Sequence, residues 1–177
     1  MTPAPEGVMD VFLAPGELWF GDALTRIHTI LGSCVAITVW HPHKLLGGMC
    51  HYVLPEQPNH RPTHLNAPDP YYASDALDCL LDEIRRSHSQ PHEFRVKLFG
   101  GGSMFPDVMA TLQARGHHAR DTMDIAGRNI DAGRSLMKRH GLHVSAEHLG
   151  GNGHRSIVFD VWTGDVWVRH QEPRHHD

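Results

Sequence analysis

The sequence has few cysteines and no long apolar run, and both absences narrow the classes of protein to which it can belong. Its 177 residues include three cysteines at uneven positions, which do not suit a disulfide framework and favour a reducing compartment. No apolar stretch approaches the ~20 residues that a membrane-spanning helix needs. The first ten residues lack a basic segment followed by an apolar one. We therefore expect no secretory signal, no membrane insertion and a cytoplasmic location.

The charged residues give no support for nucleic-acid binding. The 16 lysines and arginines are scattered along the chain rather than gathered in a stripe, and the net charge is −4 with histidine neutral. Apolar residues make up 40% of the chain and charged residues 20%, as in ordinary soluble domains. The length suits one domain at 1–177, with a core from about 8 to 170 and a polar tail at 171–177.

Hydrophobic periodicity predicts an α/β domain. Short runs rich in β-branched and apolar residues predict strands at 8–14, 25–31, 34–41, 47–54, 93–100, 142–149, 155–162 and 165–170. Apolar residues at three- and four-residue steps predict amphipathic helices at 71–88 and 124–141. Five prolines between residues 55 and 70 predict a surface loop. The expected fold is a single-domain sandwich, with one curved, largely antiparallel sheet and at least two packed helices.

Cys34 and His51 are the first candidates for a reactive pair. Cys34 follows Gly32 and Ser33, and a glycine permits a tight turn whose backbone N–H groups can face an oxyanion. His51 lies in the next predicted strand, and a histidine beside a thiol can accept its proton and later protonate a leaving amine. Free cysteines are also among the most buried residue types, so the spacing alone leaves a plain interior role open.

A metal site is a third interpretation of the same residues. The chain has 17 histidines, but no Cys-x-x-Cys pair and no helical His-x-x-x-His pair accompanies Cys34, Cys50 and His51. Cys50 and His51 are neighbours on a predicted strand, so their side chains point to opposite faces. We therefore expect no metal ion at these residues.

Two glycine-rich segments, 99–103 and 150–155, are expected to form turns. The first lacks the Lys-Ser/Thr pair that a phosphate-binding P-loop requires. Arg155 ends the second segment, and we expect its side chain to be solvated.

Five segments of the chain together carry a family resemblance. They read TILGSCVAITVWHP, GGMCHYVLP, KLFGGGSMF, AGRNI and AEHLGGNGHRSIVFDVWTGDVWVR, and the match around them runs in this order from about residue 18 to residue 169. In type and spacing they resemble the chemoreceptor glutamine deamidase family, CheD. The resemblance implies a compact α/β sandwich similar to toxin glutamine-deamidase catalytic domains. It also implies a cofactor-free protein-glutamine glutaminase that converts glutamine side chains of methyl-accepting chemotaxis receptors to glutamate.

The resemblance also implies roles for individual residues. Cys34 falls on the family nucleophile and His51 on its histidine, which together would act through a thioester. The third member is a threonine on the strand before the cysteine: Thr29 fits by type, and we choose it, whereas an ungapped alignment places His28 there. In some chemotaxis systems the family also binds a CheC-type phosphatase. The alternative function is therefore a non-catalytic adaptor that binds such a phosphatase or a receptor.

Overall fold

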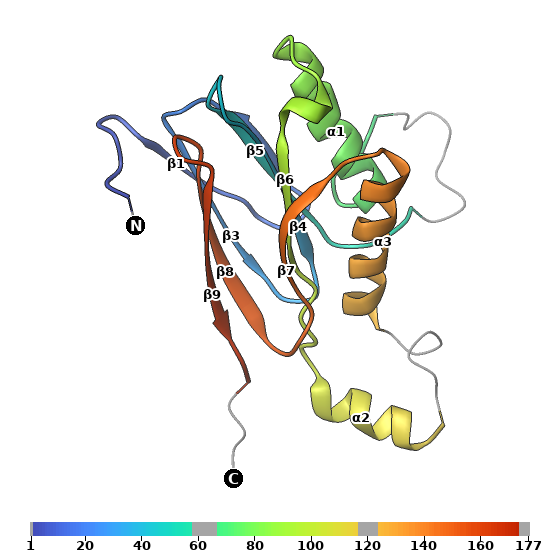
Figure 1. The fold of residues 1–177 in the computed structure, drawn as a ribbon. Coiled ribbons are helices and arrows are strands. Elements are labelled where there is room, and N and C mark those ends of the chain that lie inside the picture. The colour runs from blue at the N-terminus through green and yellow to red at the C-terminus, as the bar shows by residue number, and fades with distance from the viewer. Residues whose placement is uncertain (1, 58–66, 117–123, 174–177) are drawn as a thin grey trace.

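The computed structural model describes residues 2–57, 67–116 and 124–173 (Figure 1). Within these ranges the chain forms nine strands, three α-helices and one 3₁₀ turn at Pro91–Glu93. The strands are β1 (Met9–Phe12), β2 (Leu18–Gly21), β3 (Thr25–Leu31), β4 (Val35–His41), β5 (Leu46–Tyr52), β6 (Arg95–Gly100), β7 (Val144–Leu149), β8 (His154–Asp160) and β9 (Asp165–Gln171). The helices are α1 (Ala73–Arg86), α2 (Pro106–Ala114) and α3 (Ile125–Arg139).

The strands form two sheets that face each other. One sheet has the order β1-β3-β8-β9 and the other the order β2-β5-β4-β6-β7. Side chains from both sheets fill the space between them, for example Ile27 and Phe159 from the first sheet and Met49 and Phe99 from the second. Every second residue of β3 is buried, as expected for a strand with one face on a core and one on the surface.

Helices α1 and α3 cover the outer face of the five-stranded sheet (Figure 1). Helix α1 buries one apolar stripe there, which includes Leu77, Leu80 and Ile84. Because this face is covered too, β4 is buried on both sides over its first five residues. Asp124 precedes helix α3 and caps it, because its side-chain Oδ1 accepts a hydrogen bond from the Gly127 N–H at 2.9 Å. Helix α2 buries no residue and stands away from the sandwich (Figure 1).

The predicted α/β sandwich is confirmed, with three differences in detail. The strands form two sheets rather than the single sheet that was expected. Each sheet contains one parallel pair of strands, β1 with β3 in the first and β6 with β7 in the second. Strand β2 was not predicted, because its residues LWFG show no alternation of apolar and polar side chains. Helix α2 was not predicted either, because it lacks the apolar stripe that a packed helix shows. Most of the loop predicted between residues 55 and 70 lies outside the described residues.

Candidate functional site

Cys34 lies in the sharp turn between β3 and β4, and its side chain is half-buried. The glycines that follow β6 hold this turn: Gly101 donates its N–H to the Cys34 carbonyl at 2.8 Å, and Gly102 donates to the Gly32 carbonyl at 2.9 Å. Gly100 adopts a φ of 112°, and a Cβ at this position would collide with the Cys34 carbonyl oxygen. Only glycine therefore lets β6 approach the turn so closely.

His51 lies on β5, directly opposite Ala36 of β4, and only 1% of it is exposed. Cys34 precedes Ala36 by two residues and packs against the apolar cluster between the sheets. Side chains two positions apart on a strand share a face, and diagonal neighbours on adjacent strands can reach one another. The fold thus places the thiol and the imidazole on the same inner face of the five-stranded sheet.

Thr29 contributes the third side chain of the group, from the facing sheet. Its Oγ1 lies 2.7 Å from the Nδ1 of His51 and 3.1 Å from the Leu13 carbonyl oxygen. A carbonyl only accepts, so the single hydroxyl proton of Thr29 goes to Leu13, and its oxygen accepts the Nδ1–H of His51. The neutral ring then carries its lone pair on Nε2, which is buried and has no hydrogen-bond partner among the described residues. We call Cys34, His51 and Thr29 the Cys–His–Thr group.

His28, the other candidate for the third position, lies on the opposite face of β3. Its Nε2 lies 2.7 Å from the Asp10 carboxylate, and its ring stacks on Phe12 with 4.4 Å between the ring centroids. Neighbouring residues of a strand face opposite ways, so only one of the two can reach the space between the sheets. The structure brings Thr29, and not His28, to His51.

Burial sets the protonation states of the pair. It lowers the pKa of His51 to about 4, although the Glu17 carboxylate partly opposes the shift. Burial also raises the pKa of the Cys34 thiol, and a hydrogen bond from the residue's own backbone N–H partly opposes this rise. Both shifts disfavour a resting thiolate–imidazolium ion pair. At neutral pH the thiol and the imidazole are therefore both uncharged.

The other two cysteines have different surroundings. Cys50 is fully buried on the far face of β5, and burial raises the pKa of its thiol to about 12. Cys79 lies on α1, where burial and nearby carboxylates raise the pKa of its thiol. Within residues 2–57, 67–116 and 124–173, no three His, Cys, Asp or Glu side chains are arranged to hold a metal ion.

Sequence comparison places the chain among known proteins. A family model described as CheD chemotactic sensory transduction matches residues 53–170. The "Probable chemoreceptor glutamine deamidase CheD" of Pseudomonas fluorescens (strain SBW25) is 45% identical over 168 residues, which cover 94% of this chain and 88% of the relative. The chain belongs to the CheD family.

CheD proteins of lower identity also match almost the whole chain. The "Probable chemoreceptor glutamine deamidase CheD 3" of Dechloromonas aromatica (strain RCB) is 42% identical over 168 residues, which cover 95% of this chain and 91% of the relative. A Leptospira interrogans protein named "Probable chemoreceptor glutamine deamidase CheD 1" is 38% identical over 174 residues, covering 97% and 99%. The family model begins after His51, so it covers neither Cys34 nor His51. No helix in the described ranges is long and apolar enough to cross a membrane.

Arg155 of this CheD protein is buried, so the prediction of a solvated side chain is wrong. It lies opposite Leu31 in the four-stranded sheet, on the face that packs inward, and is 2% exposed. Its Nε donates to His148 Nδ1 at 2.8 Å, and its Nη2 donates to the Gly150 carbonyl. We expected a solvated side chain because Arg155 follows a glycine turn, and such turns usually lie at the surface. The register of β8 with β3 instead points Arg155 inward, toward the loops that support the Cys34 turn.

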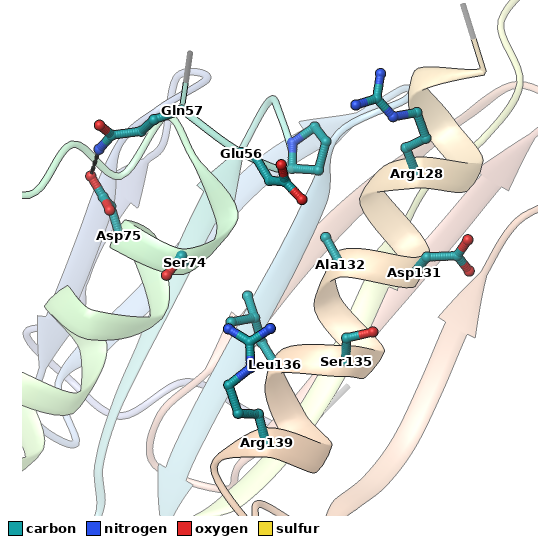
Figure 2. Close-up of a pocket in the computed structure, with 11 residues that line it drawn as sticks. Glu56, Gln57, Ser74, Asp75, Arg128, Asp131, Ala132, Ser135, Leu136 and Arg139 are labelled. Carbon is teal, nitrogen blue, oxygen red and sulfur yellow. Dashed lines mark hydrogen bonds between the residues drawn. The ribbon is translucent and has the colours of Figure 1, made fainter. Parts of the chain in front are cut away.

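A separate hollow of about 960 Å³ lies between the start of α1 and helix α3 (Figure 2). Its lining carries both signs of charge, with Glu56, Asp75 and Asp131 near Arg128 and Arg139. It lies on the helix side of the five-stranded sheet, whereas the Cys–His–Thr group faces the space between the sheets. None of its lining residues belongs to that group.

Sequence reasoning also missed Asn129, which is fully buried on α3 and donates hydrogen bonds to the carbonyls of Ser33 and Val53. The only available signal was its place in the AGRNI segment, where a polar residue interrupts the apolar face of a predicted helix.

Proposed function

We propose that this CheD protein is a protein-glutamine glutaminase that converts selected glutamine side chains of chemoreceptors to glutamate in the cytoplasm. The observation that carries the proposal is the Thr29–His51 hydrogen bond of 2.7 Å, which fixes the tautomer and leaves Nε2 free to accept a proton. The names of the relatives, at 38–45% identity over almost the full chain, supply the reaction and the class of substrate.

The first half of the reaction forms a thioester. The Cys34 sulfur attacks the side-chain carbonyl carbon of glutamine while Nε2 of His51 takes the thiol proton. The tetrahedral intermediate carries a negative oxygen, which needs N–H donors already in place. Collapse of the intermediate breaks the C–N bond, and His51 returns the proton to the departing ammonia.

The second half consumes one water. His51 takes a proton from the water, whose oxygen attacks the thioester carbon, and the proton passes to the sulfur as it leaves. The products are a glutamate side chain and the free Cys34 thiol. Thr29 orients the ring throughout both halves, as the third group of such triads does.

Methyl-accepting chemotaxis receptors are the proposed substrates. A glutamine amide and its acid differ little in size, so selectivity must come from contacts with the receptor around the glutamine. An adaptor that bound a CheC-type phosphatase would need no nucleophile beside an oriented base. The ordered Cys–His–Thr group therefore favours catalysis over the adaptor function.

The test is peptide mapping of a receptor cytoplasmic fragment after incubation with the protein. We expect the wild-type protein to convert specific glutamines to glutamate and the Cys34→Ala variant to convert none. His28→Ala is the matched control and should retain activity, since His28 lies outside the group. A receptor fragment left unchanged by the wild-type protein, or changed equally by Cys34→Ala, would overturn the proposal.

A further inference from the structure

Asn129 joins the two chain segments that carry the reactive pair. It lies in the second turn of α3 and is completely buried. Its side-chain Nδ2 donates one hydrogen bond to the Ser33 carbonyl at 3.0 Å and another to the Val53 carbonyl at 2.8 Å. Ser33 immediately precedes Cys34, and Val53 follows His51 by two residues. One amide group thus ties the nucleophile turn to the end of β5.

The orientation of this amide follows from the chemistry of its partners. Carbonyl oxygens only accept, so the side of the amide that faces Ser33 and Val53 must be the NH₂ group with its two protons. The other side, Oδ1, is buried and has no hydrogen-bond partner among the described residues. The side chain therefore makes both of the donor bonds that its NH₂ group offers, although its carbonyl is left without a partner.

The hydrogen bond to Ser33 also orients the backbone N–H of Cys34. In a planar trans peptide the C=O and the following N–H point in opposite directions. Because the Ser33 carbonyl points at Asn129, the Cys34 N–H points away from the helix. No backbone carbonyl in the described part of the chain accepts a hydrogen bond from this N–H. A backbone N–H that no carbonyl occupies, on the residue that carries the nucleophile and close to its sulfur, is placed to act as an oxyanion donor.

We propose that Asn129 is a positioning residue for the reaction: it holds the Ser33–Cys34 peptide so that the Cys34 N–H points at the oxyanion. This inference rests on the proposed function. Asn129 touches neither the substrate nor the sulfur and acts only through the peptide that it holds. Its second bond, to Val53, keeps the end of β5 at a fixed place relative to that peptide.

The surroundings of Asn129 hold the side chain in place. The Tyr52 hydroxyl donates to the Asn129 main-chain carbonyl at 2.6 Å, which fixes this turn of α3 against β5. Gly133, one turn later, leaves room for that hydroxyl, because a Cβ there would lie 2.6 Å from the Tyr52 oxygen. Neither contact involves the Asn129 side chain, so Tyr52 offers a matched control.

Two reactions of Cys34 distinguish an effect on the orientation of its backbone N–H from an effect on the reactivity of its thiol. Acylation by p-nitrophenyl acetate forms a C–S bond, passes through a tetrahedral oxyanion and expels p-nitrophenolate. Alkylation by iodoacetamide displaces iodide at a tetrahedral carbon and develops no oxyanion. Both reactions need the same sulfur and the same base. Each is followed by peptide mass mapping at Cys34, so neither depends on recognition of a receptor.

Asn129→Ala should slow acylation selectively. Loss of one oxyanion donor costs ~100- to 1,000-fold in rate, and a misaimed donor should cost at least ~10-fold. Alkylation should slow less than ~3-fold, since the thiol and His51 remain. Tyr52→Phe removes a buried hydrogen bond to the same helix and should lower thermal stability while leaving the ratio of the two rates unchanged. If Asn129→Ala slows both reactions equally, or neither, the positioning role is wrong.

Asn129→Asp keeps the test available if the alanine variant does not fold. An ionised carboxyl cannot donate to the Ser33 carbonyl, whereas a protonated carboxyl can donate one hydrogen bond. The ratio of acylation to alkylation should therefore rise as the pH falls in this variant and stay flat in the wild-type protein. A flat ratio in both would overturn the inference. Receptor deamidation by the wild-type protein is measured separately, so failure of the proposed function is distinguishable from failure of this inference.

Discussion

Replacing Thr29 by valine removes one hydroxyl with little change in shape, and the structure predicts the consequence for His51. The Nδ1–H of His51 loses its acceptor inside the protein, which costs about 1–3 kcal/mol. The ring can avoid this cost by moving its proton to Nε2, but that tautomer has no lone pair where the thiol proton must go. At about 1.4 kcal/mol for each tenfold change in rate, kcat should fall roughly 5- to 150-fold.

The assay is the initial rate of receptor glutamine conversion at saturating receptor fragment. We expect kcat to fall in Thr29→Val with KM nearly unchanged, because Thr29 orients the base and does not contact the receptor. Thr29→Ser keeps the hydroxyl and should recover most of the rate. His28→Ala, one residue away on the opposite face, should stay within about twofold of wild type. Full activity in Thr29→Val together with a crippled His28→Ala would refute the assignment.

Three further results follow from burial and protonation. Iodoacetamide should alkylate Cys34 first, Cys79 more slowly and Cys50 last, and peptide mapping that finds Cys79 ahead of Cys34 would contradict an activated Cys34. Because burial raises the pKa of the Cys34 thiol, its alkylation rate should rise further with pH through the alkaline range as the thiolate forms, and a rate that no longer rises above neutral pH would contradict the raised pKa. The pKa of His51 is about 4 in the folded chain and 6.5 in the unfolded chain, so the unfolded chain binds more protons between these two pH values. Acidification across this window should therefore lower the free energy of unfolding of the wild-type protein by on the order of 3 kcal/mol more than that of His51→Gln. Denaturant titrations of both proteins at pH 7 and pH 4 measure that difference, and equal losses would contradict the burial of His51.

The fold was predictable where a local period decides it. Strand β3 begins and ends at the predicted residues, because the alternation of buried and more exposed side chains can be recognised within its own seven residues. The division of the strands into two sheets was not predictable, since it depends on which distant strands pair. The burial of Arg155 has the same cause: its register with Leu31 in β3 turns it inward.

The candidate site was predictable only in part. The turn before Cys34 and a histidine on a neighbouring strand were predictable from the residues, but the reactive role that we propose for them came from the resemblance to CheD. The choice between Thr29 and His28 required the pleat of β3, which decides the face that each side chain occupies. Asn129 was missed because its two hydrogen bonds span 96 and 76 residues of chain, and no local pattern encodes them.

The measurement that tests the central claim most directly is the activity of His51→Gln across pH, with folding followed in the same samples. Glutamine fills similar space but cannot act as the base, so we predict no conversion of receptor glutamine at any pH and slower alkylation of Cys34. The unfolding transition of this variant should shift very little between pH 7 and pH 8, because His51 is mostly neutral there in both the folded and the unfolded wild-type chain. A His51→Gln protein that folds normally and converts receptor glutamine at the wild-type rate would contradict the Cys–His mechanism.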